Sequence, residues 1–220
     1  MTYLEIASEV ARGIPVSLGV AIGGIVVGCV LACFLVMARL SRNVISRFLS
    51  WIFLEIIRCI PMIALLFLLY YGLSQFSAVR SSIFWPILRE PLWCAIIALS
   101  LKACAYISEI YRIGIISVPE GEILAARSFG FKGFGLYRSI IVPYAARIVL
   151  PALSNEFVVL IKASSLASLI TLMDITGLVS GIASELFQPL PALTVAAVYY
   201  LVFNTLVLSA FQHLERRLAI

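Results

Sequence analysis

Charge is scarce in this sequence: Asp, Glu, Lys and Arg make up only 12% of its 220 residues, whereas about a quarter is usual in soluble domains. With 63% hydrophobic residues, a chain of this length cannot hide its apolar surface from water. The bilayer is therefore the expected solvent. Because the apolar runs are continuous and not alternating, we expect helical spans and reject a β-barrel.

The sequence also lacks the motifs of the common enzyme classes. It has no Gly-x4-Gly-Lys-Ser/Thr phosphate loop, so we do not expect this chain to be its own ATPase. Neither His-Glu-x-x-His nor Gly-x-Ser-x-Gly occurs. Ser164 and Ser165 next to Lys162 fit serine–lysine chemistry poorly, since no oxyanion site accompanies them. We expect a non-catalytic protein without a cofactor.

Metal ligands and nucleic-acid motifs are missing as well. The only histidine is His213, and it has no metal-site spacing to any of the five cysteines, which all lie in apolar runs: Cys29, Cys33, Cys59, Cys94 and Cys104. Packed free thiols are expected in place of disulfides or a metal site. The net charge of +5 is typical of membrane proteins, and its dispersal along the chain argues against nucleic-acid binding.

Five apolar runs predict an all-α membrane protein with a single transmembrane domain, 1–220. The expected spans are about 13–38, 51–73, 92–116, 146–170 and 192–211. Residues 1–13 form a polar lead whose Glu5 and Glu9 indicate a retained first span and not a cleaved signal. We expect Pro151 to interrupt the fourth span. The first span has small residues at helical spacing, which serve either a sliding or dimer face or packing within the chain: Gly19, Gly23, Gly24 and Gly28.

Cations gather on one side of these spans. The loops after the first and third spans, together with the tail, hold Arg39, Arg42, Arg47, Arg112, Arg127, Lys132, Arg138, Arg147, Arg216 and Arg217. The opposite side holds only Arg12, Arg80 and Arg89, against five acids. The positive-inside rule therefore predicts an external N-terminus and a cytoplasmic C-terminus.

Charged residues inside spans are candidates for a translocation pathway, because burying a charge in the membrane is expensive. Glu55 and Arg58 lie three residues apart and can also form a purely structural pair. Lys102 and Glu109 lie two turns apart in the third span, and the fourth carries Glu156 and Lys162, followed by Ser164. Snorkelling and structural pairing explain these residues too.

The segment 117–143 between the third and fourth spans is rich in glycine and cations. Pro119, Glu120 and Glu122 suit a helix N-terminus, Arg127 falls in the last turn, and Gly130 fits the C′ position. These signals predict a short helix of about ten residues, roughly 15 Å long. Ala125 and Ala126 at its centre leave a smooth surface that another protein can approach closely.

The same segment resembles the cytoplasmic loop of binding-protein-dependent ABC importer permeases. That loop reads Glu-Ala-Ala, three residues, Gly, nine residues, Ile, any residue, Leu, Pro. This sequence has Leu124-Ala125-Ala126, then Gly130, then Ile140, Val142 and Pro143 at the same spacing. The main departure is Leu124 in place of Glu. Leucine cannot make the salt link of a glutamate, whereas the helix itself can still dock.

Three further segments resemble the polar amino acid permeases, with the histidine, basic amino acid and opine branch closest. They are EIIRCIPMIALLFLLYYGL (55–73), LSLKACAYISEIYRIGIISVPEGE (99–122) and LPALSNEFVVLIKASSLASLI (150–170). The resemblance covers most of the chain.

The resemblance implies a type I importer subunit in the bacterial inner membrane that takes up amino acids or opines. Its partners would be a second permease chain, a cytoplasmic ATPase dimer that binds the ATP, and an external solute-binding protein. The coupling residues would be Gly121, Glu122, Leu124, Ala125, Ala126, Arg127 and Gly130. An ion-coupled secondary amino acid transporter is the main alternative, and a membrane scaffold is the third.

Overall fold

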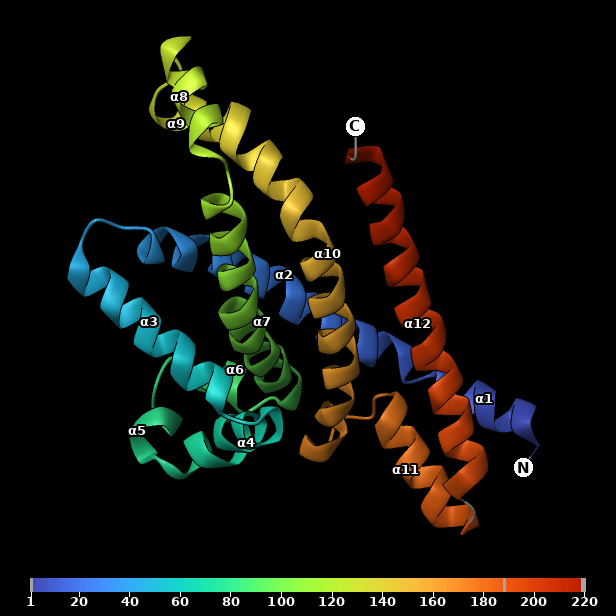
Figure 1. Cartoon of the computed structure of the whole chain (residues 1–220). Helices are drawn as coiled ribbons and strands as arrows, with labels where there is room; N and C mark the ends of the chain where they lie inside the picture. The colour runs from blue at the N-terminus through green and yellow to red at the C-terminus, as the bar shows by residue number, and fades with distance from the viewer. Residues whose placement is uncertain (1, 188, 219–220) are drawn as a thin grey trace.

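The computed structural model describes residues 2–187 and 189–218, and every regular element in this part of the chain is a helix. Four helices dominate the bundle in Figure 1: α2 (Ile14–Arg39), α7 (Pro91–Ile116), α10 (Val142–Ala163) and α12 (Pro189–Leu218). Together with the short helices on either side of it, α10 belongs to one apolar stretch, Gly133–Ile170. All four stretches are long and apolar enough to cross a bilayer.

The fifth candidate span is a bent pair of helices. Helix α3 (Val44–Cys59) is followed by α4 (Met62–Phe67), the π-helical turn η1 (Leu68–Gly72) and the 3₁₀ turn η2 (Leu73–Gln75), and the two halves meet at 104°. In Figure 1, α3 runs back from the end where α2 finishes, and α7 starts beside α4. The run 51–73, expected as one span, is therefore split at residues 60–61.

Pro61 explains the break. It has no N–H to donate to the carbonyl of Ile57, and a residue before proline disfavours the α conformation. Ile60 is accordingly extended, with φ −70° and ψ 125°. The interruption expected at Pro151 is wrong, because α10 continues through that residue. Prolines are tolerated within membrane helices where neighbouring groups satisfy the freed carbonyl.

Helices α2 and α7 share the most extensive contact among the described elements. A Cβ added to Gly24 would lie 2.5 Å from the Leu99 Cβ, and one added to Gly28 would lie 2.3 Å from the Ala103 Cβ. Gly24 and Gly28 are therefore used to bring two helices of the same chain together. This outcome favours packing within the chain over a sliding face for these two glycines. Gly19 has nothing within 4 Å of an added Cβ.

Two short helices cover the end of the bundle where α12 begins. The expected polar lead is in fact helix α1 (Tyr3–Ala11), capped by Thr2 and Glu5, and it buries Ile6 and Val10. These side chains pack with residues of α11 (Ile175–Leu186) and α12. The connection before α7 contains two four-residue helices, α5 (Ser77–Arg80) and α6 (Trp85–Leu88).

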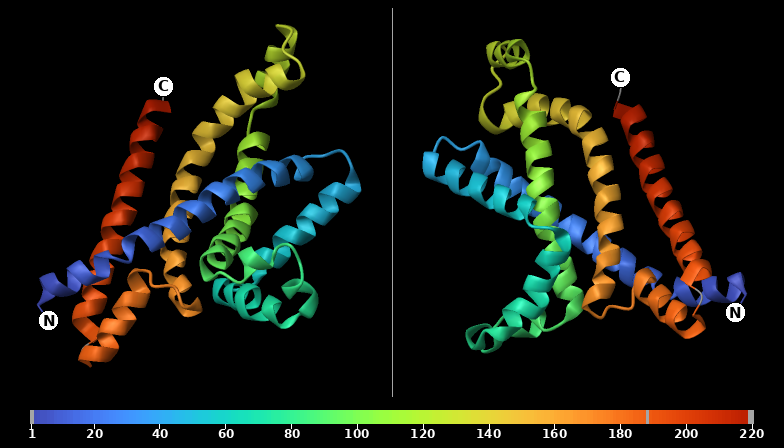
Figure 2. Two further views of the ribbon diagram at one scale, coloured as in Figure 1. Left: turned by 180° about the vertical axis from the view of Figure 1, so that it is seen from behind. Right: turned by 60° about the horizontal axis from the view of Figure 1, so that its bottom comes forward.

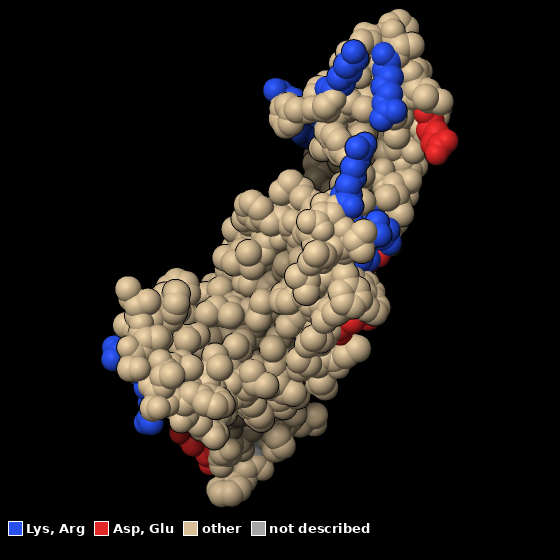
Figure 3. Space-filling model, turned by 90° about the vertical axis from the view of Figure 1, so that its left-hand side faces the viewer, with Lys and Arg blue, Asp and Glu red and all other residues tan. Residues whose placement is uncertain are grey.

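The opposite end carries the polar segment as a projection. It contains α8 (Glu120–Ser128), α9 (Gly133–Leu136) and the π-helical turn η3 (Tyr137–Ile141), which leads into α10. Both views in Figure 2 show this segment beyond the bundle. Figure 3 shows basic side chains concentrated at this projecting end and an almost uncharged belt below it. Such a belt is what contact with hydrocarbon requires.

Candidate functional site

Helix α8 ends in a glycine-dependent cap. Gly130 follows the C-cap residue Phe129 and has φ +90°, a conformation that side chains rarely adopt. Its N–H donates to the carbonyl of Arg127 at 3.0 Å, and the N–H of Phe131 donates to the carbonyl of Ala126 at 3.0 Å. These two bonds form a Schellman motif. The predicted helix and its glycine stop are confirmed.

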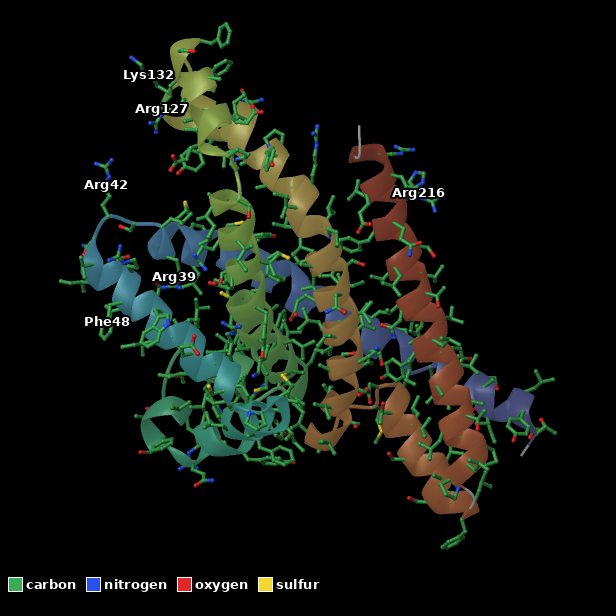
Figure 4. The ribbon with its side chains drawn as sticks, in the orientation of Figure 1. Arg39, Arg42, Phe48, Arg127, Lys132 and Arg216 are labelled. Carbon is green, nitrogen blue, oxygen red and sulfur yellow. The ribbon has the colours of Figure 1, made fainter. Side chains whose placement is uncertain are left out.

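The sides of α8 differ sharply. Ala126 is buried against the stem formed by Val118, Leu136 and Ile141. The other predicted coupling residues are exposed: Gly121, Glu122, Leu124, Ala125, Arg127 and Gly130. Leu124 is 62% exposed and Phe129 85% exposed, and both stand on a segment that Figure 4 marks with Arg127 and Lys132. An exposed apolar surface bordered by cations is typical of a protein contact.

Lys102 lies at the break between α3 and α4 and is 8% exposed. Its ammonium group donates to the carbonyl of Ile57 at 2.7 Å, to that of Arg58 at 3.3 Å, and to that of Ile60. An ammonium group has three donors, so all of them are used. Lys102 therefore caps the broken helix, and its positive charge also suits a helix C-terminus.

Three further charged groups surround this break. Glu55 and Arg58 form an ion pair at 4.0 Å, and the Arg58 guanidinium lies 5.2 Å from the ring centroid of Tyr106. Glu156, on α10, is half-buried and within electrostatic range of Arg58 and Lys102. The structure thus brings four of the predicted pathway residues, Glu55, Arg58, Lys102 and Glu156, to one region between α3, α7 and α10.

Glu109 belongs to a different cluster. It accepts from Nε of Arg112 at 2.9 Å and 3.0 Å, and the guanidinium of Arg39 lies 3.8 Å away. Figure 4 shows Arg39 at the end of α2, beside α7. The sequence alone predicts Arg39 only as a loop cation. Spacing along one helix signals the Glu109–Arg112 pair, whereas no local pattern connects Arg39 to α7.

The last two predicted pathway residues lie at the end of α10 and directly after it. Lys162 lines a groove of about 540 Å³ between α10 and α12, together with Ser165, Tyr200 and Asn204. Ser164, the first residue of the 3₁₀ helix after α10, is 1% exposed and donates to the carbonyl of Ile161 at 2.7 Å. In the part of the chain that the structure describes, the seven predicted pathway residues therefore do not form one site. No group of three metal-ligating side chains occurs among the described residues.

This arrangement, a bundle of four long helices and one bent pair with a capped helix projecting from its basic end, is that of a transport permease. The family described as "Binding-protein-dependent transport system inner membrane component" matches residues 10–220. The chain belongs to this family.

Similar proteins include permeases for opines and basic amino acids. The octopine transport system permease protein OccM of Rhizobium meliloti is 43% identical over 92% of this chain and 83% of its own length. The nopaline transport system permease protein NocM of Agrobacterium fabrum is 44% identical over 80% of this chain and 73% of its own length. The histidine/lysine/arginine/ornithine transport system permease protein HisM of Salmonella typhimurium is 39% identical over 83% of this chain and 78% of its own length.

Two solved structures share the architecture. A chain of an amino acid ABC transporter crystallised with histidines has a TM-score of 0.85 and 26% identity, over 99% of both chains. A chain of the MetNI methionine ABC transporter in an inward-facing conformation has a TM-score of 0.73 and 18% identity over 96% of both. These likenesses confirm the type I importer permease fold.

Proposed function

We propose that this chain is the permease subunit of an ATP-driven importer for polar amino acids, in particular basic amino acids, histidine or opines. It would work in the bacterial inner membrane with a second permease chain, identical or paralogous. A cytoplasmic ATPase dimer would bind the ATP, and an external solute-binding protein would deliver the solute. The 39–44% identity to opine and basic amino acid permeases supports the solute class.

The observation that carries the coupling role is the exposed, Schellman-capped helix α8 at the basic end of the bundle. Its buried Ala126 anchors it to the stem that leads into α10, so a movement of α8 is passed to a spanning helix. Closure of an ATPase dimer on two such helices would convert ATP binding into a change of access. This chain performs no chemistry on the solute.

The pathway is proposed to pass the region between α3, α7 and α10. Glu156 is the strongest candidate for a solute contact there, because it is half-buried and no other described side chain forms an ion pair with it. A carboxylate at this place suits the ammonium or guanidinium group of a basic amino acid or opine. Lys102, with its donors used, would hold the broken helix that forms the wall.

The test is reconstitution. The purified chain and its candidate ATPase and permease partners are placed in proteoliposomes, with the candidate solute-binding protein outside. Uptake of radiolabelled arginine, histidine, octopine and leucine is then measured. We expect uptake that requires ATP and the binding protein and that favours the first three solutes. Uptake driven by a proton or sodium gradient without ATP would instead identify an ion-coupled transporter.

A further inference from the structure

An apolar groove of about 500 Å³ opens between α2, α7, α10 and α12, near the end of the bundle that carries α8. Its walls include Met37 of α2, Ile115 of α7, Ala146 of α10 and Leu214 of α12. Tyr111 and Cys33 contribute the only polar side-chain atoms of the lining. Glu156, Lys102 and Arg58 of the proposed pathway do not line this groove, whose lining on α10 ends at Leu153.

The groove follows α10 from Val142 to Leu153. At 1.5 Å per residue this stretch is roughly 16 Å long. The hydrocarbon core of a bilayer is about 30 Å thick, so the groove has the depth of one leaflet. A single extended acyl chain of a phospholipid fits this length and this apolar lining.

Two arginines lie along the chain just beyond the lining residues. Arg138 precedes the lining residue Val142 by about one turn, and Arg217 follows the lining residue Leu214 by three residues, so each continues the face that lines the groove. Both are exposed, and neither forms an ion pair with another described residue. Figure 4 shows Arg216 at this end of α12. Glu215 is the acidic neighbour, and it leaves the border net positive.

We propose that this groove binds one acyl chain of an anionic phospholipid, whose phosphate is held by Arg138 and Arg217. A guanidinium group matches the geometry of a phosphate and can donate two hydrogen bonds to it. Basic pockets between membrane helices are known to select anionic headgroups. The outer face of α3 offers a contrast: Phe48 there is 55% exposed, points away from the bundle in Figure 4 and is not among the residues that line the groove. Such a face meets bulk lipid.

The experiment places the full chain in bilayer discs that contain equal amounts of phosphatidylglycerol and phosphatidylcholine, and native mass spectrometry identifies the lipids that stay bound. We expect one retained phosphatidylglycerol per chain. The double substitution Arg138→Gln/Arg217→Gln should lower the preference for this lipid roughly 30-fold, about fivefold per arginine. Arg42→Gln/Arg47→Gln removes two exposed cations away from the groove and should leave the preference unchanged.

The second part of the experiment fills the groove with a larger side chain. Ala146→Trp should lower retention of both lipids, whereas Ile148→Trp, at a 40% exposed position of the same helix outside the lining, should not. Since Ala146→Trp can also disturb folding, Met37→Trp serves as a reporter that leaves the lining open to a chain. In a chain whose native Trp51, Trp85 and Trp93 are replaced by Phe, the fluorescence of this reporter should be quenched more by brominated phosphatidylglycerol than by brominated phosphatidylcholine.

Three results on lipid binding would overturn the proposal. They are equal retention of the two lipids by the unmodified chain, unchanged retention after Ala146→Trp, and equal quenching of the Met37→Trp reporter. Loss of the second permease chain from a purified complex of Ala146→Trp, but not of Ile148→Trp, would also overturn it. That result would make the groove a contact between protein chains.

Discussion

Lys102 shows how a charge can be buried among membrane helices for a structural reason. Its three donors meet three carbonyls around the break before Pro61. Replacing it with Met would remove the donor that these three carbonyls share. Hydrogen bonds from a charged donor contribute about 1.5–3 kcal/mol each, so we expect Lys102→Met to destabilise the chain by at least 2 kcal/mol.

Thermal unfolding of the detergent-purified chain measures this effect. Lys162→Met is the matched control, because Lys162 is exposed and makes no hydrogen bond to a described residue through its side chain. We expect a melting temperature several degrees lower for Lys102→Met and little change for the control. Equal melting temperatures for the two variants would refute the capping role of Lys102.

Asp174 is a second buried charge, located in the connection before α11. Its Oδ1 accepts from the N–H of Gly177 at 2.8 Å, whereas its Oδ2 is buried without a hydrogen-bond partner among the described residues. Burial raises the pKa of Asp174 from 3.8 to about 6. A raised pKa means that the folded state holds the proton more tightly. The contribution of Asp174 to the free energy of unfolding is therefore fully present below about pH 4 and is lost as the pH rises through 6.

Asp174→Asn keeps the acceptor for Gly177 and removes the buried charge. Because a pKa unit corresponds to about 1.4 kcal/mol, we expect stabilisation of up to about 3 kcal/mol at pH 8 and little difference at pH 4. Unfolding at several pH values checks this, with the exposed Glu185→Gln on α11 as the control. A constant difference between pH 4 and pH 8 would argue against the titration of Asp174.

Residue chemistry was predictable from the sequence only where partners are close along the chain. The Glu55–Arg58 pair follows from helical spacing, and so does the stop at Gly130. The carbonyls that bind Lys102 lie 42–45 residues away, and Arg39 meets Glu109 across two helices. Such contacts depend on how the helices pack, which spacing along a single helix does not reveal.

At the scale of elements, the α2–α7 contact depends on the absence of a side chain at Gly28. A Cβ there would approach the Ala103 Cβ to 2.3 Å and the backbone oxygen of Ser100 to 3.1 Å. Neither atom can move without shifting a helix, and overpacking of this kind typically costs about 1–3 kcal/mol. We therefore expect Gly28→Ala to destabilise the chain.

Gly19→Ala on the same helix is the comparison, since an added Cβ there meets nothing within 4 Å. Alanine also favours helix more than glycine does, so this variant should be neutral or slightly more stable. Thermal unfolding of both variants in one detergent gives the answer. Similar melting temperatures would show that α2 and α7 separate easily.

The capped helix α8 gives a prediction about coupling. Gly130→Val places a β-branched residue at φ +90° and should distort the end of α8. We expect the variant to insert into membranes normally and to lose most of its ATPase on co-purification. Gly135→Ala lies in α9, where an added Cβ meets nothing, and should keep the ATPase. Full ATPase recovery with Gly130→Val would count against α8 as the docking element.

Apolar runs predicted most long helices but not the route of the chain at prolines. Pro61 and Pro151 both lie within apolar runs, yet only Pro61 breaks its helix. The difference is in the surroundings. The carbonyls that lose their helical partners at residues 57–60 accept hydrogen bonds from Lys102 of α7. A polar partner from another helix stabilises the broken form, and the sequence around either proline does not contain it.

At the scale of the whole molecule, the number of crossings decides where the two termini lie. Four helices are long and apolar enough to cross the bilayer. The bent pair α3–α4 makes a fifth crossing if its two halves traverse the bilayer together. In Figure 1 the N- and C-termini lie at opposite ends of the bundle, as an odd number of crossings requires. A re-entrant pair would instead give four crossings and would place both termini on the same side.

The positive-inside rule then assigns the sides. Because most of the cations lie at the end that carries α8 and the end of α12, this end is predicted to be cytoplasmic. We expect green fluorescent protein fused after the last residue to fluoresce in cells, and alkaline phosphatase fused there to be inactive. Phosphatase fused after Arg80, in the connection that follows the bent pair, should be active. An inactive fusion at Arg80 together with a fluorescent C-terminus would identify α3–α4 as a re-entrant pair, and the proposed external N-terminus would then be wrong.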